Sequence, residues 1–130
     1  MTRILVVEDN MDSRDILTFE LEAEGYAVQA VSDGLSAVEA VASFQPDLII
    51  MDISLPTIDG LEATRRIKTQ PDFADIPVLA LTAHAMTEDE ARFRAAGCDH
   101  YLAKPTSPEA VLRTVRQLLA QPRPGSASVC

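Results

Sequence analysis

The stretch Ile4-Leu5-Val6-Val7-Glu8-Asp9 joins a short apolar run, mostly β-branched, directly to two acids. A run of this length is typical of a strand buried on both faces of a parallel sheet. Similar short runs recur along the chain, separated by turn residues and by longer segments. We therefore predict strands at about residues 3–7, 27–31, 47–51, 77–81 and 100–103.

The longer segments between these runs repeat their apolar residues at the period of an α-helix. Ile16, Leu17 and Leu21 share one helical face, as do Val38, Val41 and Ala42. The clearest stripe consists of Val111, Leu112, Val115, Leu118 and Leu119. Segment 87–96 has no broad apolar stripe, so we expect a loosely anchored and largely exposed helix there. Alternating strands and helices predict an α/β fold with a parallel sheet covered by helices.

The composition indicates one compact acidic domain. The chain has 130 residues, of which 20 are acidic and 11 basic, giving a formal charge of -9. We assign residues 1–120 to the domain and residues 121–130, rich in Pro, Ser and small residues, to a flexible tail or the remnant of a linker. The acid excess would repel phosphate backbones and anionic lipid, so we expect no direct nucleic-acid or membrane partner.

Cysteine use and the N-terminus indicate where the protein works. Cys98 and Cys130 have no metal-ligand spacing, which favours reduced thiols. The apolar run after Arg3 is far too short for a signal peptide. We therefore expect a cytoplasmic protein.

Polar residues follow four of the five predicted strands. The first is followed by Glu8 and Asp9, the third by Asp52, the fourth by Thr82 and the fifth by Lys104. The carboxyl ends of parallel strands lie at one edge of the sheet, so these side chains should converge there. Carboxylates about 4 Å apart repel by several kcal/mol, and a hard divalent cation relieves this repulsion best. The few oxygen ligands favour Mg²⁺, with Mn²⁺ as a second possibility.

A carboxylate beside a divalent cation, a lysine and a hydroxyl is suited to accept a phosphoryl group. Such transfer needs positioning and charge neutralisation more than it needs covalent help. Asp52 is the predicted nucleophile because it lies at a strand end among the other groups. Glu8 and Asp9 are better placed as metal ligands, bound directly or through water. Taken singly, however, an acid pair after a strand is often only a helix cap, and a lysine only a solvated charge.

With these residues in view, the sequence strongly resembles the receiver domain of two-component response regulators, from Ile4 to about Leu119. The matching segments, in order, are Val6-Val7-Glu8-Asp9-Asn10, Met51-Asp52-Ile53-Ser54-Leu55-Pro56, Asp59-Gly60, Leu81-Thr82-Ala83 and Leu102-Ala103-Lys104-Pro105. The resemblance implies a flavodoxin-like fold, a three-layer sandwich of five strand-helix units with sheet order 2-1-3-4-5. It also implies a signalling domain that is not a conventional enzyme and that catalyses its own phosphorylation and dephosphorylation.

The resemblance further assigns roles to individual residues. Asp52 would take a phosphoryl group from a histidine kinase or a histidine phosphotransfer protein and then change the surface presented to a downstream effector, which the sequence does not identify. The expected metal ligands are Asp9, Asp52 and the backbone carbonyl of Ser54, with Glu8 assisting. Lys104, Thr82 and the Ala83 amide would contact the phosphoryl oxygens. Thr82 and Tyr101 would form the switch, and the Lys104-Pro105 peptide is expected to be cis.

Two other classes of function use similar residues. A metal-dependent phosphatase or phosphotransferase with an aspartyl intermediate would need a second acid two residues after the nucleophile, where this chain has Ser54. A nucleotide-binding module would need a glycine-rich phosphate loop, which does not follow the first strand. Both alternatives therefore fit less well than the receiver domain. Tyr101 is about as well explained by static packing as by a switch.

Overall fold

The protein is described by a computed structural model that covers residues 2–53, 58–82, 87–104 and 107–120. Within these residues, parallel strands β1 (Arg3–Val7), β2 (Ala27–Val31), β3 (Leu48–Asp52), β4 (Val78–Thr82) and β5 (His100–Ala103) form one sheet. The strand order is β2-β1-β3-β4-β5, as predicted. Each strand matches its prediction within one residue, and the flavodoxin-like fold is confirmed.

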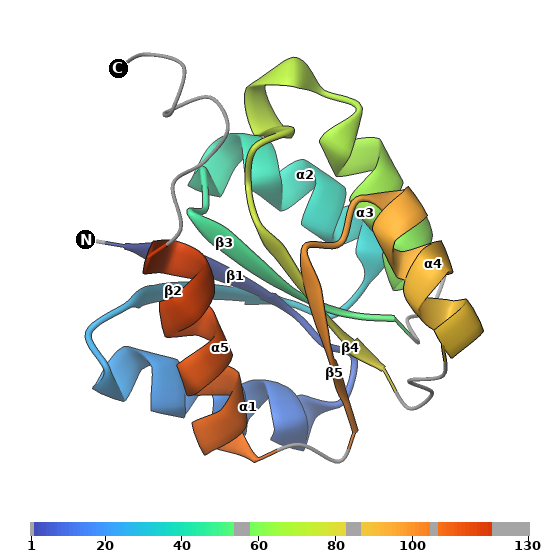
Figure 1. Cartoon of the computed structure of the whole chain (residues 1–130). Helices are drawn as coiled ribbons and strands as arrows, with labels where there is room; N and C mark the ends of the chain where they lie inside the picture. Colours follow the sequence, from blue (N-terminus) through green and yellow to red (C-terminus); the bar gives the residue numbers. More distant parts are fainter. Residues whose placement is uncertain (1, 54–57, 83–86, 105–106, 121–130) are drawn as a thin grey trace.

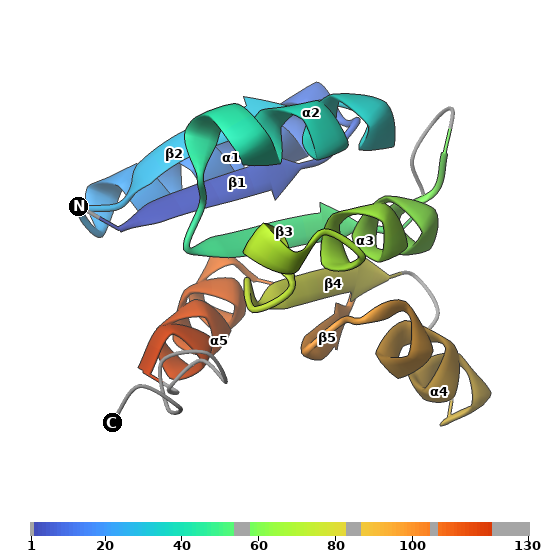
Figure 2. The same ribbon diagram turned by 90° about the horizontal axis from the view of Figure 1, so that it is seen from above.

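Helices cover both faces of this sheet (Figures 1 and 2). The described helices are α1 (Met11–Ala23), α2 (Gly34–Phe44), α3 (Gly60–Lys68), α4 (Thr87–Ala96) and α5 (Pro108–Ala120), with a short 3-10 turn η1 (Pro71–Phe73). Helices α2, α3 and α4 share one core with one face of the sheet, and α1 and α5 share a second core with the other face. The result is the predicted three-layer sandwich.

Successive side chains of the central strands belong alternately to the two cores. In β1, Leu5 and Val7 enter the core under α2 and α3, whereas Ile4 and Val6 enter the core under α1 and α5. All five residues of β3 are buried, whereas the edge strand β2 contains none that is fully buried. The continuous apolar character of the central strands is explained by burial on both faces.

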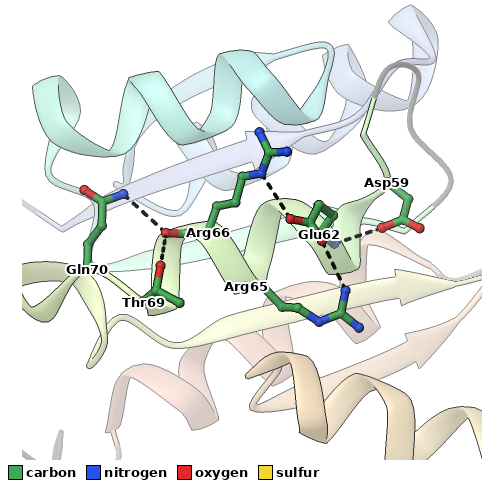
Figure 3. A network of polar contacts seen from close by, with 6 residues as sticks. All are labelled: Asp59, Glu62, Arg65, Arg66, Thr69 and Gln70. Atoms are coloured by element: carbon green, nitrogen blue, oxygen red, sulfur yellow. Dashed lines mark hydrogen bonds and ion pairs between the residues drawn. The ribbon is translucent and has the colours of Figure 1, made fainter.

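The start of α3 is fixed by a cap and a small charge network, drawn in Figure 3. The Asp59 carboxylate accepts a hydrogen bond from the backbone N–H of Glu62 at 2.8 Å. The Glu62 carboxylate in turn pairs with Arg66 at 3.1 Å and with Arg65 at 3.4 Å. An acid in the first turn and bases in the last turn also suit the helix dipole. These exposed ion pairs each contribute little, but the cap fixes where the helix begins.

Two helices differ in detail from the sequence-based expectation. In α1, Leu17 and Leu21 are buried as predicted, but Ile16 is 53% exposed. In α2, Val41 is buried and Ala42 is exposed. Helix α4 is anchored by Phe93 and Ala96, while residues 91, 92, 94 and 95 are exposed, which confirms a weakly anchored helix.

In the described part of the chain, no helix is both long and apolar enough to cross a membrane.

Candidate functional site

Strand register brings the predicted site residues to one edge of the sheet. Val7, at the end of β1, pairs with Met51 of β3, so the next residues, Glu8 after β1 and Asp52 at the end of β3, lie at the same edge of the sheet. Asp52 pairs with Leu81 of β4, and Thr82 pairs with Ala103 of β5. The backbone N–H of Lys104 then donates to the carbonyl of Thr82 at 2.6 Å, which extends this pairing to the lysine.

Three carboxylates form the centre of the site. Glu8, Asp9 and Asp52 each offer an oxygen, and these oxygens lie within 4.8 Å of one another. Glu8 is 3% exposed and Asp52 2% exposed, whereas Asp9 is open to solvent. Burying two carboxylates together is costly unless other charges compensate them.

Lys104 supplies part of this compensation. Its Nζ lies 3.0 Å from Asp52 Oδ2 and 3.5 Å from Glu8 Oε1. Partial burial by itself lowers the pKa of Lys104, but the hydrogen bond and charge of Asp52, together with Glu8, outweigh burial and raise this pKa. Lys104 is therefore held as a cation beside both carboxylates.

Glu8 remains electrostatically strained. Burial, followed by the hydrogen bond and negative charge of Asp52, raises its pKa from 4.5 to about 7, although Lys104 acts in the opposite direction. Glu8 Oε2 is buried and meets no hydrogen-bond donor among the described residues. A buried oxygen without a donor, next to two further carboxylate oxygens, fits a hard divalent cation. The cluster can therefore bind a metal ion.

The loop after β1 is held by the backbone and by one arginine. The Glu8 N–H donates to the Val31 carbonyl of β2 at 3.1 Å, and Arg14 Nη1 donates to the Glu8 carbonyl at 3.1 Å. Asn10, rather than either acid, caps α1, because its side chain accepts from the Ser13 N–H at 2.9 Å. The helix-cap explanation therefore applies to Asn10 and leaves the two acids to the cluster. Sequence reasoning missed Arg14, whose only signal was a base one helical turn after the acids.

The remaining predicted residues fall into two groups. Thr82 is 4% exposed at the end of β4, and Tyr101 is half-buried in β5 with its ring 5.5 Å from that of Phe93 in α4. Ser54, Ala83 and Pro105, including the predicted cis peptide, lie outside the described residues, as does segment 121–130.

Comparison with known proteins identifies the class to which this fold and acidic site belong. Residues 4–116 match the model of the response regulator receiver domain. The polar-differentiation response regulator DivK of Brucella anthropi is 39% identical over 116 residues, which cover 89% of this chain and 94% of that protein. DivK of Brucella ovis matches to the same extent. This chain belongs to the response regulator receiver family, which acts in two-component signalling.

Solved structures agree with this assignment. Chemotaxis protein CheY4 of Vibrio cholerae superposes with a TM-score of 0.87 at 29% identity, covering 91% of this chain and 98% of that one. The receiver domain of sensor histidine kinase PA1611 from Pseudomonas aeruginosa superposes with a TM-score of 0.84 at 36% identity, covering 92% and 98%. That structure has a magnesium ion coordinated in its active-site cleft.

Proposed function

We propose that Asp52 is the phosphoacceptor of this receiver domain and that Mg²⁺, or alternatively Mn²⁺, assists the transfer. The observation that carries the proposal is the position of Asp52, 2% exposed at the end of β3, between the acids after β1 and the cation of Lys104. We assign residues 1–120 to the receiver domain and residues 121–130 to a tail or linker.

Transfer from a phosphorylated histidine would form one P–O bond and break one P–N bond. A carboxylate oxygen of Asp52 attacks phosphorus, the P–N bond breaks, and its electron pair passes to the imidazole nitrogen, which takes a proton. A bound Mg²⁺ would neutralise charge on the phosphoryl oxygens. Asp9 and Asp52, with Glu8 directly or through water, would hold this ion, and the Ser54 carbonyl is the fourth proposed ligand. The domain would catalyse both this step and the later hydrolysis.

Lys104 has a second use during the transfer. Its Nζ, 3.0 Å from Asp52, is placed to contact the phosphoryl oxygens as they arrive, and the raised pKa keeps it protonated. The Thr82 hydroxyl and the Ala83 amide complete the proposed set of donors, and the Lys104-Pro105 peptide is proposed to be cis. Because Thr82 ends β4 and Lys104 directly follows β5, phosphorylation would displace the ends of the two strands that α4 connects.

We propose that the domain signals through this displacement at the ends of β4 and β5. Phosphorylation adds nearly two negative charges at Asp52, which gives Thr82 a partner that exists only in the phosphorylated state. Tyr101 lies one strand away and packs against Phe93, one of the few buried residues of α4. A movement of Thr82 would therefore reach Tyr101 and then a helix that shifts at low cost. The downstream effector would bind this altered surface.

A histidine kinase or histidine phosphotransfer protein is the proposed donor, and α1 offers a surface for it. Within the described residues, the large hydrophobic side chains that are exposed are Met11, Ile16 and Phe19 of α1 and Leu35 of α2. Phe19 is 70% exposed, and Met11 begins the helix directly after the acidic pair. Exposed apolar groups beside a reactive site are typical of a protein-binding surface.

The free, buried Cys98 thiol fits the reducing cytoplasm, which we propose as the location.

Asp52→Asn tests the proposal, with Asp47→Asn as the matched control at the opposite end of β3. Incubation with acetyl phosphate and Mg²⁺ should add one base-labile phosphate to the wild-type chain and to Asp47→Asn. Asp52→Asn should remain unlabelled, and a chelator should stop labelling of the wild-type chain and of Asp47→Asn. Labelling of Asp52→Asn at the wild-type rate would show that Asp52 is not the phosphoacceptor.

A further inference from the structure

Gly60, the first residue of α3, lies directly against the backbone that carries Asp52. A β-carbon built at Gly60 would lie 2.8 Å from Ile53 Cα and 2.9 Å from the Asp52 carbonyl carbon, and closer still to the Asp52 carbonyl oxygen. Distances under 3.0 Å are essentially never seen for real β-carbons. All three neighbours are backbone atoms, which cannot rotate away as a side chain can. Any residue other than glycine would therefore displace the end of β3 or the start of α3.

The contact is also a hydrogen-bonded junction. The Gly60 N–H donates to the Ile53 carbonyl at 2.9 Å, and the Ile53 N–H donates to the Leu81 carbonyl of β4 at 3.0 Å. The Asp52–Ile53 peptide is thus held between β4 and α3. On the helix side, the Thr64 hydroxyl, which is buried, donates to the Gly60 carbonyl at 2.8 Å. Together with the Asp59 cap, this bond fixes the first turn of α3.

The backbone conformation at position 60 does not explain why a glycine is needed there. Positive φ angles among the described glycines occur at Gly25 and Gly97, and Gly60 is not among them. The residue is needed for close approach and not for a left-handed turn. Its effect is therefore exerted on the atoms it touches, which are those of Asp52 and Ile53.

We propose that Gly60 is a positioning residue for Asp52: the close approach of its Cα and its hydrogen bond to Ile53 set where the Asp52 carboxylate lies relative to Glu8, Asp9 and Lys104. This inference rests on the proposed function, in which Asp52 accepts the phosphoryl group and helps to bind the metal ion. Both of those events depend on atomic placement, because a misplacement of about 1 Å can cost on the order of 100-fold in rate.

Gly60→Ala tests this role, with Gly97→Ala as the destabilising control. Gly97 follows α4 and has φ 106, and a β-carbon built there would lie 2.9 Å from Lys68 Cγ. Lys68 is the last residue of α3, so this strain falls at the opposite end of the helix from Gly60. The two readouts are Mg²⁺ affinity, measured by calorimetric titration of the unphosphorylated protein, and the rate of labelling by acetyl phosphate at saturating Mg²⁺. Circular dichroism melts record the loss of stability in each variant.

Gly60→Ala should weaken Mg²⁺ binding several-fold and slow labelling about tenfold or more. Gly97→Ala should lower the melting temperature but keep both readouts within about twofold of wild type, because its strain lies at the other end of α3. Wild-type values in Gly60→Ala, or the same losses in Gly97→Ala, would overturn the positioning role. If Gly60→Ala does not fold, Gln45→Gly is added, because Gln45 at the end of α2 has φ 53, a left-handed conformation that glycine adopts without strain. The measurements are then made in this double variant with sucrose, which favours the compact state.

Failure of the inference is separable from failure of the proposed function. If the wild-type chain is labelled at Asp52 and Gly60→Ala is labelled equally fast, Asp52 remains the phosphoacceptor and only the role of Gly60 is wrong. If Asp52→Asn is labelled like the wild type, the proposed function itself is wrong.

Discussion

Replacing Glu8 by Gln should stabilise the metal-free protein at alkaline pH, and the size of the effect follows from the electrostatics of the site. Glutamine keeps the shape of Glu8 but removes its charge. Its amide can donate toward Asp52 as protonated Glu8 would, and its oxygen can still accept from Lys104, which lies 3.5 Å from Glu8 Oε1. The variant therefore imitates the protonated wild-type side chain at every pH.

The pKa of Glu8 gives the magnitude and the sign. Folding raises this pKa from 4.5 to about 7, so the folded state holds its proton more tightly than the unfolded state does. Between these two values, the stability due to Glu8 falls as pH rises, because the folded protein must release a proton that the unfolded chain has already lost. At 1.36 kcal/mol per pH unit, the full loss is about 3 kcal/mol, which we take as an upper bound. For a domain of this size, that corresponds to a melting temperature change on the order of 10 °C.

The assay is urea unfolding of metal-free wild-type protein and Glu8→Gln at pH 5, 6, 7 and 8, with Glu39→Gln as an exposed control. The variant should exceed the wild type by less than about 1 kcal/mol at pH 5 and by up to about 3 kcal/mol at pH 8. Saturating Mg²⁺ should then stabilise the wild type more than it stabilises Glu8→Gln. A difference that does not change with pH, or a Glu8→Gln variant that is less stable at pH 8, would refute the electrostatic account of Glu8.

Three further predictions concern a helix end, a surface and the switch. Gln45 has φ 53 at the end of α2, so Gln45→Gly should raise the free energy of unfolding by about 0.5–1 kcal/mol in urea titrations. Gly25 has φ 95 and nothing lies within 4 Å of a β-carbon built there, so Gly25→Ala should lower the free energy of unfolding by about 1 kcal/mol through backbone strain alone. Phe19→Ser should slow transfer from a phosphorylated kinase or phosphotransfer protein but leave labelling by acetyl phosphate unchanged, whereas equal slowing of both would mean that Phe19 does not contact the donor. Thr82→Ala should still be phosphorylated, but the changes in amide exchange that beryllofluoride induces at residues 82–104 should be suppressed; changes centred on 33–45 instead would contradict the proposed route.

The strands could be predicted closely because their signal is local. Apolar runs bounded by turn residues gave β1, β2 and β5 at their observed limits, and β3 and β4 with limits one residue too early. The discrepancy has a physical cause. Asp52 and Thr82 continue the ladders, since they pair with Leu81 and Ala103, although their polar side chains look like the start of a loop. The residues that carry the chemistry are thus held by the sheet itself.

The periodicity of apolar residues predicted where the helices lie more accurately than it predicted which of their residues are buried. Ile16 adjoins Leu17 in the sequence and lies about 100° from it around the helix, so it was counted as part of the apolar stripe. The core accepts Leu17 and Leu21 but leaves Ile16 53% exposed, because the width of the buried stripe depends on which neighbours cover it. A one-dimensional pattern cannot supply that width. An apolar residue at the edge of a stripe can therefore belong to the core or to a binding surface.

Sequence reasoning predicted that the polar groups converge, but not the backbone contacts that surround them. Asp59-Gly60 matched a family motif, but nothing in the sequence shows that Gly60 lies on the carbonyl of Asp52, eight positions earlier. The same holds for Arg14, whose bond to the Glu8 carbonyl depends on how α1 leaves the sheet. Sequence patterns thus predict which groups gather at the site, whereas the contacts that surround those groups emerge only from the packing.

The charges at the site explain how a divalent cation would fit beside Lys104. Glu8, Asp9 and Asp52 contribute three negative charges when ionised, and Lys104 returns one positive charge, which leaves two negative charges at the sheet edge. In the metal-free protein, a proton on Glu8 removes one of them, and burial, followed by the hydrogen bond and charge of Asp52, favours this proton by raising the pKa of Glu8. A divalent cation would remove both at once and would release that proton. The same ion would also leave Lys104 less firmly held by the carboxylates, and so more available to an incoming phosphoryl group.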